Sequence, residues 1–81
     1  MTVQVRMFAR ARDLAGRDAV TVLVPAGAKV GDLRRQLAAD MPALAGLLAR
    51  SVFAVGGEFA EDGHAIPDGA EVALIPPVSG G

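Results

Sequence analysis

The sequence ends in two glycines, Gly80 and Gly81, which follow a pair of prolines, Pro76 and Pro77. Proline fixes φ and lacks an N–H, so we expect the pair to end the last strand and to stiffen the start of a tail. Because glycine has no Cβ, Gly80 and Gly81 can enter a channel that is closed to larger residues. The chemistry at such a tip is that of the Gly81 main-chain carboxylate, which is ionised at neutral pH and needs activation before a nucleophile can replace its oxygen. The alternative is a frayed terminus without a function.

Other residue types that carry chemistry are scarce. Cysteine is absent, which excludes disulfides, thiolate metal sites, thiol nucleophiles and a cysteine persulfide as a sulfur carrier. His64 is the one histidine, and without further His or Cys ligands it does not indicate a metal or acid–base site. The acidic residues Glu58, Glu61 and Asp62 lack the spacing of a calcium loop, so a solvated surface is favoured. We therefore predict no catalytic residue, no metal and no permanently bound cofactor.

The composition indicates one small folded domain. The chain has 81 residues, of which 52% are hydrophobic and 21% charged, enough for one modest core. The net charge of −1 and the absence of Trp and Tyr argue against nucleic acid as a partner. No apolar run has the length of a membrane span, and no signal-peptide pattern is present, so we expect a cytoplasmic protein without a membrane partner.

The hydrophobic pattern predicts four or five strands. Apolar residues at every second position around Val5 indicate the first strand, and residues 19–24 read as the second. Residues 53–55 and 71–75 read as later strands, with a minor strand starting at Phe59. The apolar stripe Val30, Leu33, Leu37 and Met41 predicts one main amphipathic helix. A second, short helix follows it, with Leu44, Leu47 and Leu48 facing inward, and residues 10–15 predict another short helix.

This order of elements predicts an α+β chain with the β-grasp (ubiquitin-like) fold. In that fold the first and last strands lie side by side in a mixed sheet of four or five strands, with one main helix across it and short extra helices. We expect residues 1–75 to form this domain and residues 76–81 to form a flexible tail.

Three segments resemble a known family. Phe8 to Gly16, Phe53 to Val55 and Pro67 to Gly81 are similar to signatures of the molybdopterin synthase small subunit, the MoaD family of ubiquitin-like sulfur carriers. The Asp-Gly turn, the final strand, the double proline and the Gly-Gly end stand in register, and the resemblance runs from end to end. One departure is Gly56-Gly57, where the family often has Asn, and a turn variant is the favoured explanation.

The resemblance implies a role in molybdenum cofactor biosynthesis. In this family a ubiquitin-activating-type adenylyltransferase uses ATP to convert the terminal carboxylate to an acyl adenylate, and a sulfur donor then replaces AMP to leave a thiocarboxylate. The tail inserts into the large synthase subunit, which transfers the sulfur to a pterin precursor to form the dithiolene. Gly81 would carry the sulfur here, with Gly80, Ser79, Val78, Pro77 and Pro76 giving it access. The chain itself would be a non-catalytic subunit of a heterotetramer of two small and two large subunits.

The same resemblance also implies a partner interface. Phe8 and Ile75 fall on the strand faces opposite the core-facing residues, and with Phe59 they correspond to apolar partner contacts of the family. Arg10 and Arg12 flank them as candidates for ion pairs at the rim. Burial under a loop or helix, and ordinary solvation of the arginines, are the alternatives.

Three other functions share parts of this pattern. Carriers for thiamin or cysteine synthesis use the same tail chemistry, although they are often shorter and lack the Pro-Pro-Val neck. A ubiquitin-like modifier would join Gly81 to a lysine through an isopeptide bond. A plain interaction module would carry an inert tail.

Overall fold

The computed structural model describes residues 1–77, so Val78, Ser79, Gly80 and Gly81 of the predicted tail lie outside the described residues. Within that range the elements are β1 (Thr2–Met7), α1 (Ala9–Ala15), β2 (Ala19–Leu23), α2 (Val30–Asp40), the 3-10 helix η1 (Pro42–Leu44), α3 (Ala45–Leu48), β3 (Val52–Val55), β4 (Glu58–Ala60) and β5 (Val72–Ile75).

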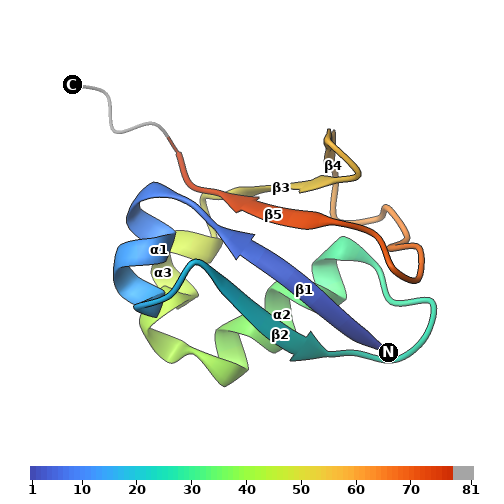
Figure 1. Cartoon of the computed structure of the whole chain (residues 1–81), viewed down its shortest axis with the longest axis horizontal. Coiled ribbons are helices and arrows are strands. Elements are labelled where there is room, and N and C mark those ends of the chain that lie inside the picture. The colour runs from blue at the N-terminus through green and yellow to red at the C-terminus, as the bar shows by residue number, and fades with distance from the viewer. Residues whose placement is uncertain (78–81) are drawn as a thin grey trace.

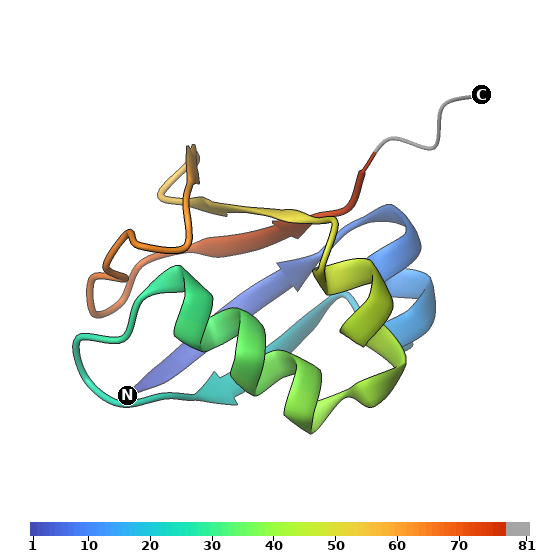
Figure 2. The same cartoon turned by 180° about the vertical axis from the view of Figure 1, so that it is seen from behind.

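The strands of this part of the chain form one mixed sheet in the order β2-β1-β5-β3-β4 (Figure 1). β1 and β5 lie side by side in parallel, and the other neighbouring strands are antiparallel. α2 crosses one face of the sheet, which we call the inner face (Figure 2). The arrangement confirms the predicted β-grasp fold, with one main helix and short extra helices.

The core lies between α2 and the inner face of the sheet. Val5 and Val72 are paired across β1 and β5 and are both fully buried, as the alternation of apolar residues predicts. Leu33 and Leu37 of α2 are also fully buried, and so is Phe53 of β3. The end of the predicted stripe differs, because Met41 follows α2 and is only half-buried.

The start of α2 is fixed by the loop of residues 61–66. The Val30 N–H donates to the His64 carbonyl and the Gly31 N–H donates to the Asp62 carbonyl, each at 2.9 Å. A Cβ at position 31 would lie 3.2 Å from the Asp62 Cβ, which is closer than most real Cβ contacts. Glycine at position 31 therefore lets the loop approach the first turn of the helix and satisfy two of its free N–H groups.

Arg34 joins three elements through one guanidinium. Its Nε and its Nη2 lie 3.1 and 2.9 Å from the Asp62 carboxylate. Its Nη1 donates to the carbonyls of Leu48, at the end of α3, and of Ser51, just before β3. The guanidinium carbon lies 5.1 Å from the centroid of the Phe53 ring. The side chain is only 21% exposed, so these contacts lie in a partly desolvated environment where they are stronger than on an open surface.

The hairpin between β3 and β4 accounts for the Gly56-Gly57 pair. Val55 pairs with Glu58, which leaves these two residues as the loop. Their φ angles are 59° and 86°, the combination of a type I′ turn, which favours Gly and Asn. Glycine at position 56 therefore suits the turn that this loop needs.

Several predicted bounds shift by one residue. α1 begins at Ala9, β2 ends at Leu23, β3 includes Val52, and β5 begins at Val72. Leu47 was predicted to face inward and is only half-buried, whereas Leu44 and Leu48 are buried as predicted. The strand ends depend on backbone hydrogen bonds to neighbouring strands, which the hydrophobic pattern does not contain.

Candidate functional site

The chain leaves the sheet at the end of β5. Ile75 is the last residue of the strand, Pro76 is buried, and Pro77 is exposed. Pro76 thus packs against the domain, and neither proline has an N–H that could extend the sheet. The division into a domain and a tail at residue 76 stays a prediction, because four of the six tail residues lie outside the described part.

Three apolar side chains lie in a row beside this exit. β1 and β5 are paired up to Met7 and Leu74, so Phe8 and Ile75 are the next residues along the two strands. Ile75 in turn pairs with Val52 of β3. Phe8 is 43% exposed and Val52 46%, and Ile75 is partly exposed. The row therefore presents apolar surface on the face opposite α2.

A second row extends the surface to the edge of the sheet. Ala73 of β5 pairs with Ala54 of β3, which pairs with Phe59 of β4. Phe59 is 76% exposed. We call the two rows together the apolar outer face, made of Phe8, Val52, Ala54, Phe59, Ala73 and Ile75.

The sequence prediction named three members of this face and missed the residues that connect them. Phe59 and Ile75 are not direct neighbours, because β3 lies between their strands. Val52 and Ala54 of β3 lie in that gap, and of the two only Val52 is exposed, since Ala54 is buried. The alternation of side chains along a strand could have predicted both residues, because Phe53 faces the core and its two neighbours must face the other way.

Arg6, which the sequence prediction did not include, places a positive charge beside the Phe8 ring. The Arg6 guanidinium carbon lies 5.7 Å from the centroid of the Phe8 ring, and its Nη1 lies 3.4 Å from the Glu71 carboxylate. Arg10 is exposed on the first turn of α1, and Arg12 lies 3.8 Å from the Asp18 carboxylate with both side chains exposed. The rim role of Arg10 and Arg12 stays a prediction.

Strained backbone follows directly after Phe8. Ala9 has a φ of 47°, and it is the one non-glycine residue of the described part with a positive φ. This region costs an alanine about 1 kcal/mol or more. The strain lies directly after Phe8, where the chain turns from β1 into α1.

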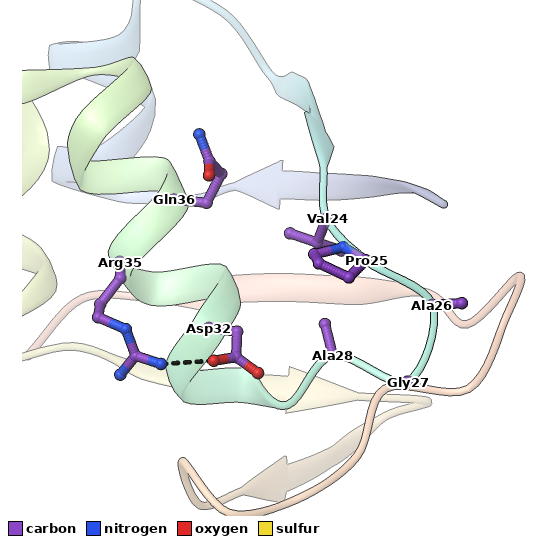
Figure 3. A pocket seen from close by; sticks show the side chains of 8 residues that line it. All are labelled: Val24, Pro25, Ala26, Gly27, Ala28, Asp32, Arg35 and Gln36. Atoms are coloured by element: carbon purple, nitrogen blue, oxygen red, sulfur yellow. Dashed lines mark hydrogen bonds and ion pairs between the residues drawn. The ribbon is translucent and has the colours of Figure 1, made fainter.

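A hollow at the other end of the molecule has no connection with the exit. It lies between the loop of residues 24–28 and one face of α2, and Asp32, Arg35 and Gln36 line it (Figure 3). Asp32 and Arg35 form an ion pair there. The Lys29 N–H donates to the Asp32 carboxylate at 2.9 Å, and this bond, followed by the charge of Arg35, holds the pKa of Asp32 below its usual value.

His64 is exposed, and its carbonyl is used by the first turn of α2. Residues 1–77 contain no group of three or more His, Asp or Glu that could hold a metal ion. In the same range no helix has the length and apolar character needed to cross a membrane.

Fold and site together define a β-grasp protein with an apolar outer sheet face beside the end of β5, the strand that precedes the Gly80-Gly81 end of the sequence. The chain belongs to the ThiS family, whose sequence profile matches residues 5–81.

Individual relatives cover the chain almost completely. The molybdopterin synthase sulfur carrier subunit of Chlamydomonas reinhardtii is 41% identical, with all of both chains covered. Among solved structures, small archaeal modifier protein 1 of Haloferax volcanii is 33% identical with a TM-score of 0.84, covering 95% of this chain and 98% of that one. A putative molybdopterin converting factor subunit 1 of Pyrococcus furiosus is 30% identical with the same TM-score, covering 96% and 99%.

Proposed function

We propose that this chain is the sulfur-carrier subunit of a molybdopterin synthase. The observation that carries the proposal is the family match, which runs through the tail to Gly81. In addition, a relative named as such a subunit aligns over its whole length. With this role we also propose a cytoplasmic location.

The chemistry of the proposal takes place at the Gly81 carboxylate. An adenylyltransferase joins one carboxylate oxygen to the α-phosphate of ATP and releases pyrophosphate. A sulfur donor at the oxidation level of sulfide then attacks the acyl carbon, the bond to AMP breaks, and a thiocarboxylate remains. Activation is needed because a free carboxylate resists attack, and ATP is a substrate of the activating enzyme rather than a cofactor of this chain.

The described residues support a role as a protein substrate. The apolar outer face adjoins the exit at Pro76, so a partner that covers Phe8 and Ile75 is in position to receive the tail. Apolar and aromatic side chains of this kind provide much of the binding energy of protein interfaces. We propose that the large synthase subunit and the adenylyltransferase bind this face in turn, that catalytic residues lie on the large subunit, and that two copies of each subunit form the synthase.

The test is intact-mass spectrometry before and after incubation with the cognate adenylyltransferase, ATP and sulfide. The first spectrum establishes the residue that carries the terminal carboxylate. We expect the second to show the replacement of one oxygen by one sulfur at Gly81. Deletion of Gly81 should abolish this change and leave the melting temperature unaltered, because the deletion lies beyond the packed core. Sulfur transfer to the pterin by the deleted form would contradict the proposal.

Gly80→Val examines access to the activating enzyme. A β-branched side chain widens and stiffens the tip, so pyrophosphate exchange catalysed by the adenylyltransferase should collapse while the fold is retained. Exchange at the wild-type rate would show that no narrow channel receives the tail.

The modifier function is the second candidate, because small archaeal modifier protein 1 has a closely similar fold. A modifier would appear in the same spectra as a conjugate with another protein. A carrier for thiamin or cysteine synthesis would gain the same sulfur but would not support dithiolene formation with a large synthase subunit. An unchanged mass would indicate an inert tail.

A further inference from the structure

The edge strand β2 has an uncovered side that is complementary to itself. β2 lies at the end of the strand order and pairs with β1 alone among residues 1–77 (Figure 1). Edge strands of natural proteins are usually protected by charges, prolines, bulges or covering segments. The five residues of β2 are Ala, Val, Thr, Val and Leu, and none of them gives such protection.

The hydrogen bonds of the β1–β2 ladder show which backbone N–H and C=O groups of β2 do not bond to β1. The Met7 N–H donates to the Asp18 carbonyl at 2.7 Å, and the Val24 N–H donates to the Met1 carbonyl at 3.0 Å. In an antiparallel ladder, residues that face the partner strand alternate with residues that face away. Val20 and Val22 therefore point their N–H and C=O groups toward β1. The corresponding groups of Ala19, Thr21 and Leu23 point outward from the edge of the sheet.

A second copy fits this edge about a two-fold axis through Thr21. An antiparallel pairing centred there places Thr21 opposite Thr21 of the second copy, and Ala19 opposite Leu23. All three are then hydrogen-bonded pairs, in which each residue exchanges its N–H and C=O with its counterpart. The outward groups of one strand thus meet the outward groups of the other in register.

The side chains agree with this register. Leu23 is 70% exposed and would pack beside Ala19 of the second copy, which leaves room for it. The charged residues that precede the strand, Arg17 and Asp18, would lie opposite Pro25 and Val24, so no like charges meet. Pro25 lacks an N–H and ends the pairing at that point.

We infer that two copies of this chain associate through their β2 edges, in antiparallel register about Thr21, to form a continuous sheet. β2 and β4 lie at opposite ends of the strand order, so the contact leaves Phe59 and the β5 exit uncovered. It is small for a protein interface, which predicts weak association that is concentration-dependent. The inference is independent of the proposed function.

The test is amide hydrogen exchange of the isotopically labelled full chain, followed residue by residue by NMR from micromolar to millimolar concentration. In the monomer the amides of Ala19, Thr21 and Leu23 exchange fast, while those of Val20 and Val22 are protected. We expect protection of the first three to rise with concentration, together with the weight-average mass from sedimentation equilibrium.

Two variants and a control separate this contact from other modes of association. Thr21→Pro removes an outward N–H while keeping the bonds to β1, and Thr21→Lys places like charges opposite each other. Each should weaken the association by about tenfold or more. Gln4→Lys is the matched control. It adds the same charge to the neighbouring strand and removes the hydrogen bond between Thr21 and Gln4, yet it leaves the edge intact, so association should persist.

A monomer at every concentration, with fast exchange at Ala19, Thr21 and Leu23 throughout, would overturn the inference. So would an association that both Thr21 variants leave unchanged, or one whose concentration-dependent shifts centre on Phe8 and Phe59.

Discussion

Replacement of Phe8 by alanine measures the contribution of the apolar outer face to partner binding. When fully covered, a Phe side chain buries on the order of 200 Å². The 43% of Phe8 that is exposed in the free chain therefore corresponds to about 85 Å² that a partner can still bury. At about 25 cal/mol per Å², this area contributes about 2 kcal/mol to binding. Phe8→Ala should thus raise the Kd for the large synthase subunit about 30-fold.

The same exposure limits the effect on folding. Part of the ring already contacts solvent, so Phe8→Ala should lower the free energy of unfolding by about 1–2 kcal/mol, less than the roughly 3–5 kcal/mol expected for a buried Phe. Calorimetric titration with the purified large subunit gives the Kd, and urea unfolding gives the stability. Leu23→Ala is the control, because Leu23 is exposed but lies on β2, outside the apolar outer face. A large loss of stability with an unchanged Kd would show that the Phe8 ring belongs to the core.

Three further predictions concern the scaffold. Arg34→Ala should lower the free energy of unfolding by about 2–3 kcal/mol, since it removes the charged donor of the Leu48 and Ser51 carbonyls. Arg35→Ala, which breaks an exposed pair, should cost about 0.5 kcal/mol or less. Equal losses of unfolding free energy in the two variants, measured by urea unfolding, would contradict this prediction. Asp32 has a lowered pKa in the folded state, so its stabilisation is present above the pKa of the unfolded chain and is lost as the pH falls through the folded-state pKa. The stability difference between wild type and Asp32→Asn should shrink over that acidic range, and a constant difference would contradict the assignment. Ala9→Gly should raise the melting temperature by relieving a positive φ, whereas Ala39→Gly in regular helix should lower it; a decrease in both would show that Ala9 is not strained.

The fold was predictable because its signals are local. Alternating apolar residues around Val5 define β1, and the spacing of Val30, Leu33 and Leu37 defines the buried side of α2. Each pattern reflects the geometry of a single element, so it can be recognised without knowledge of the partner element. The exposure of Phe8 and Ile75 follows from the same alternation, since their strand neighbours fill the core.

The long-range contacts were not predictable in this way. In the sequence, Arg34 is one of several charged residues on a predicted helix surface. Only the folded chain brings it to Asp62, which lies 28 positions later in the sequence. Gly31 reads as a residue that weakens its helix, and the close approach of the Asp62 loop becomes evident only in three dimensions. The positive φ of Ala9 has no signal in the residue type, because alanine ordinarily avoids that region.

The position of the exit gives the proposed carrier a way to couple recognition with delivery. Parallel pairing of β1 with β5 places Phe8 and Ile75 side by side, and the same β5 leads directly into Pro76. Because Pro76 is buried, the predicted tail would start from a fixed point on the domain rather than from a loose linker. A partner that binds the apolar outer face therefore meets a tail whose origin is already set. Fixing that origin lowers the entropy lost when the tail enters a channel. One face could thus serve the proposed activating enzyme and the proposed synthase subunit in turn, provided that each places its channel at the same end of the sheet.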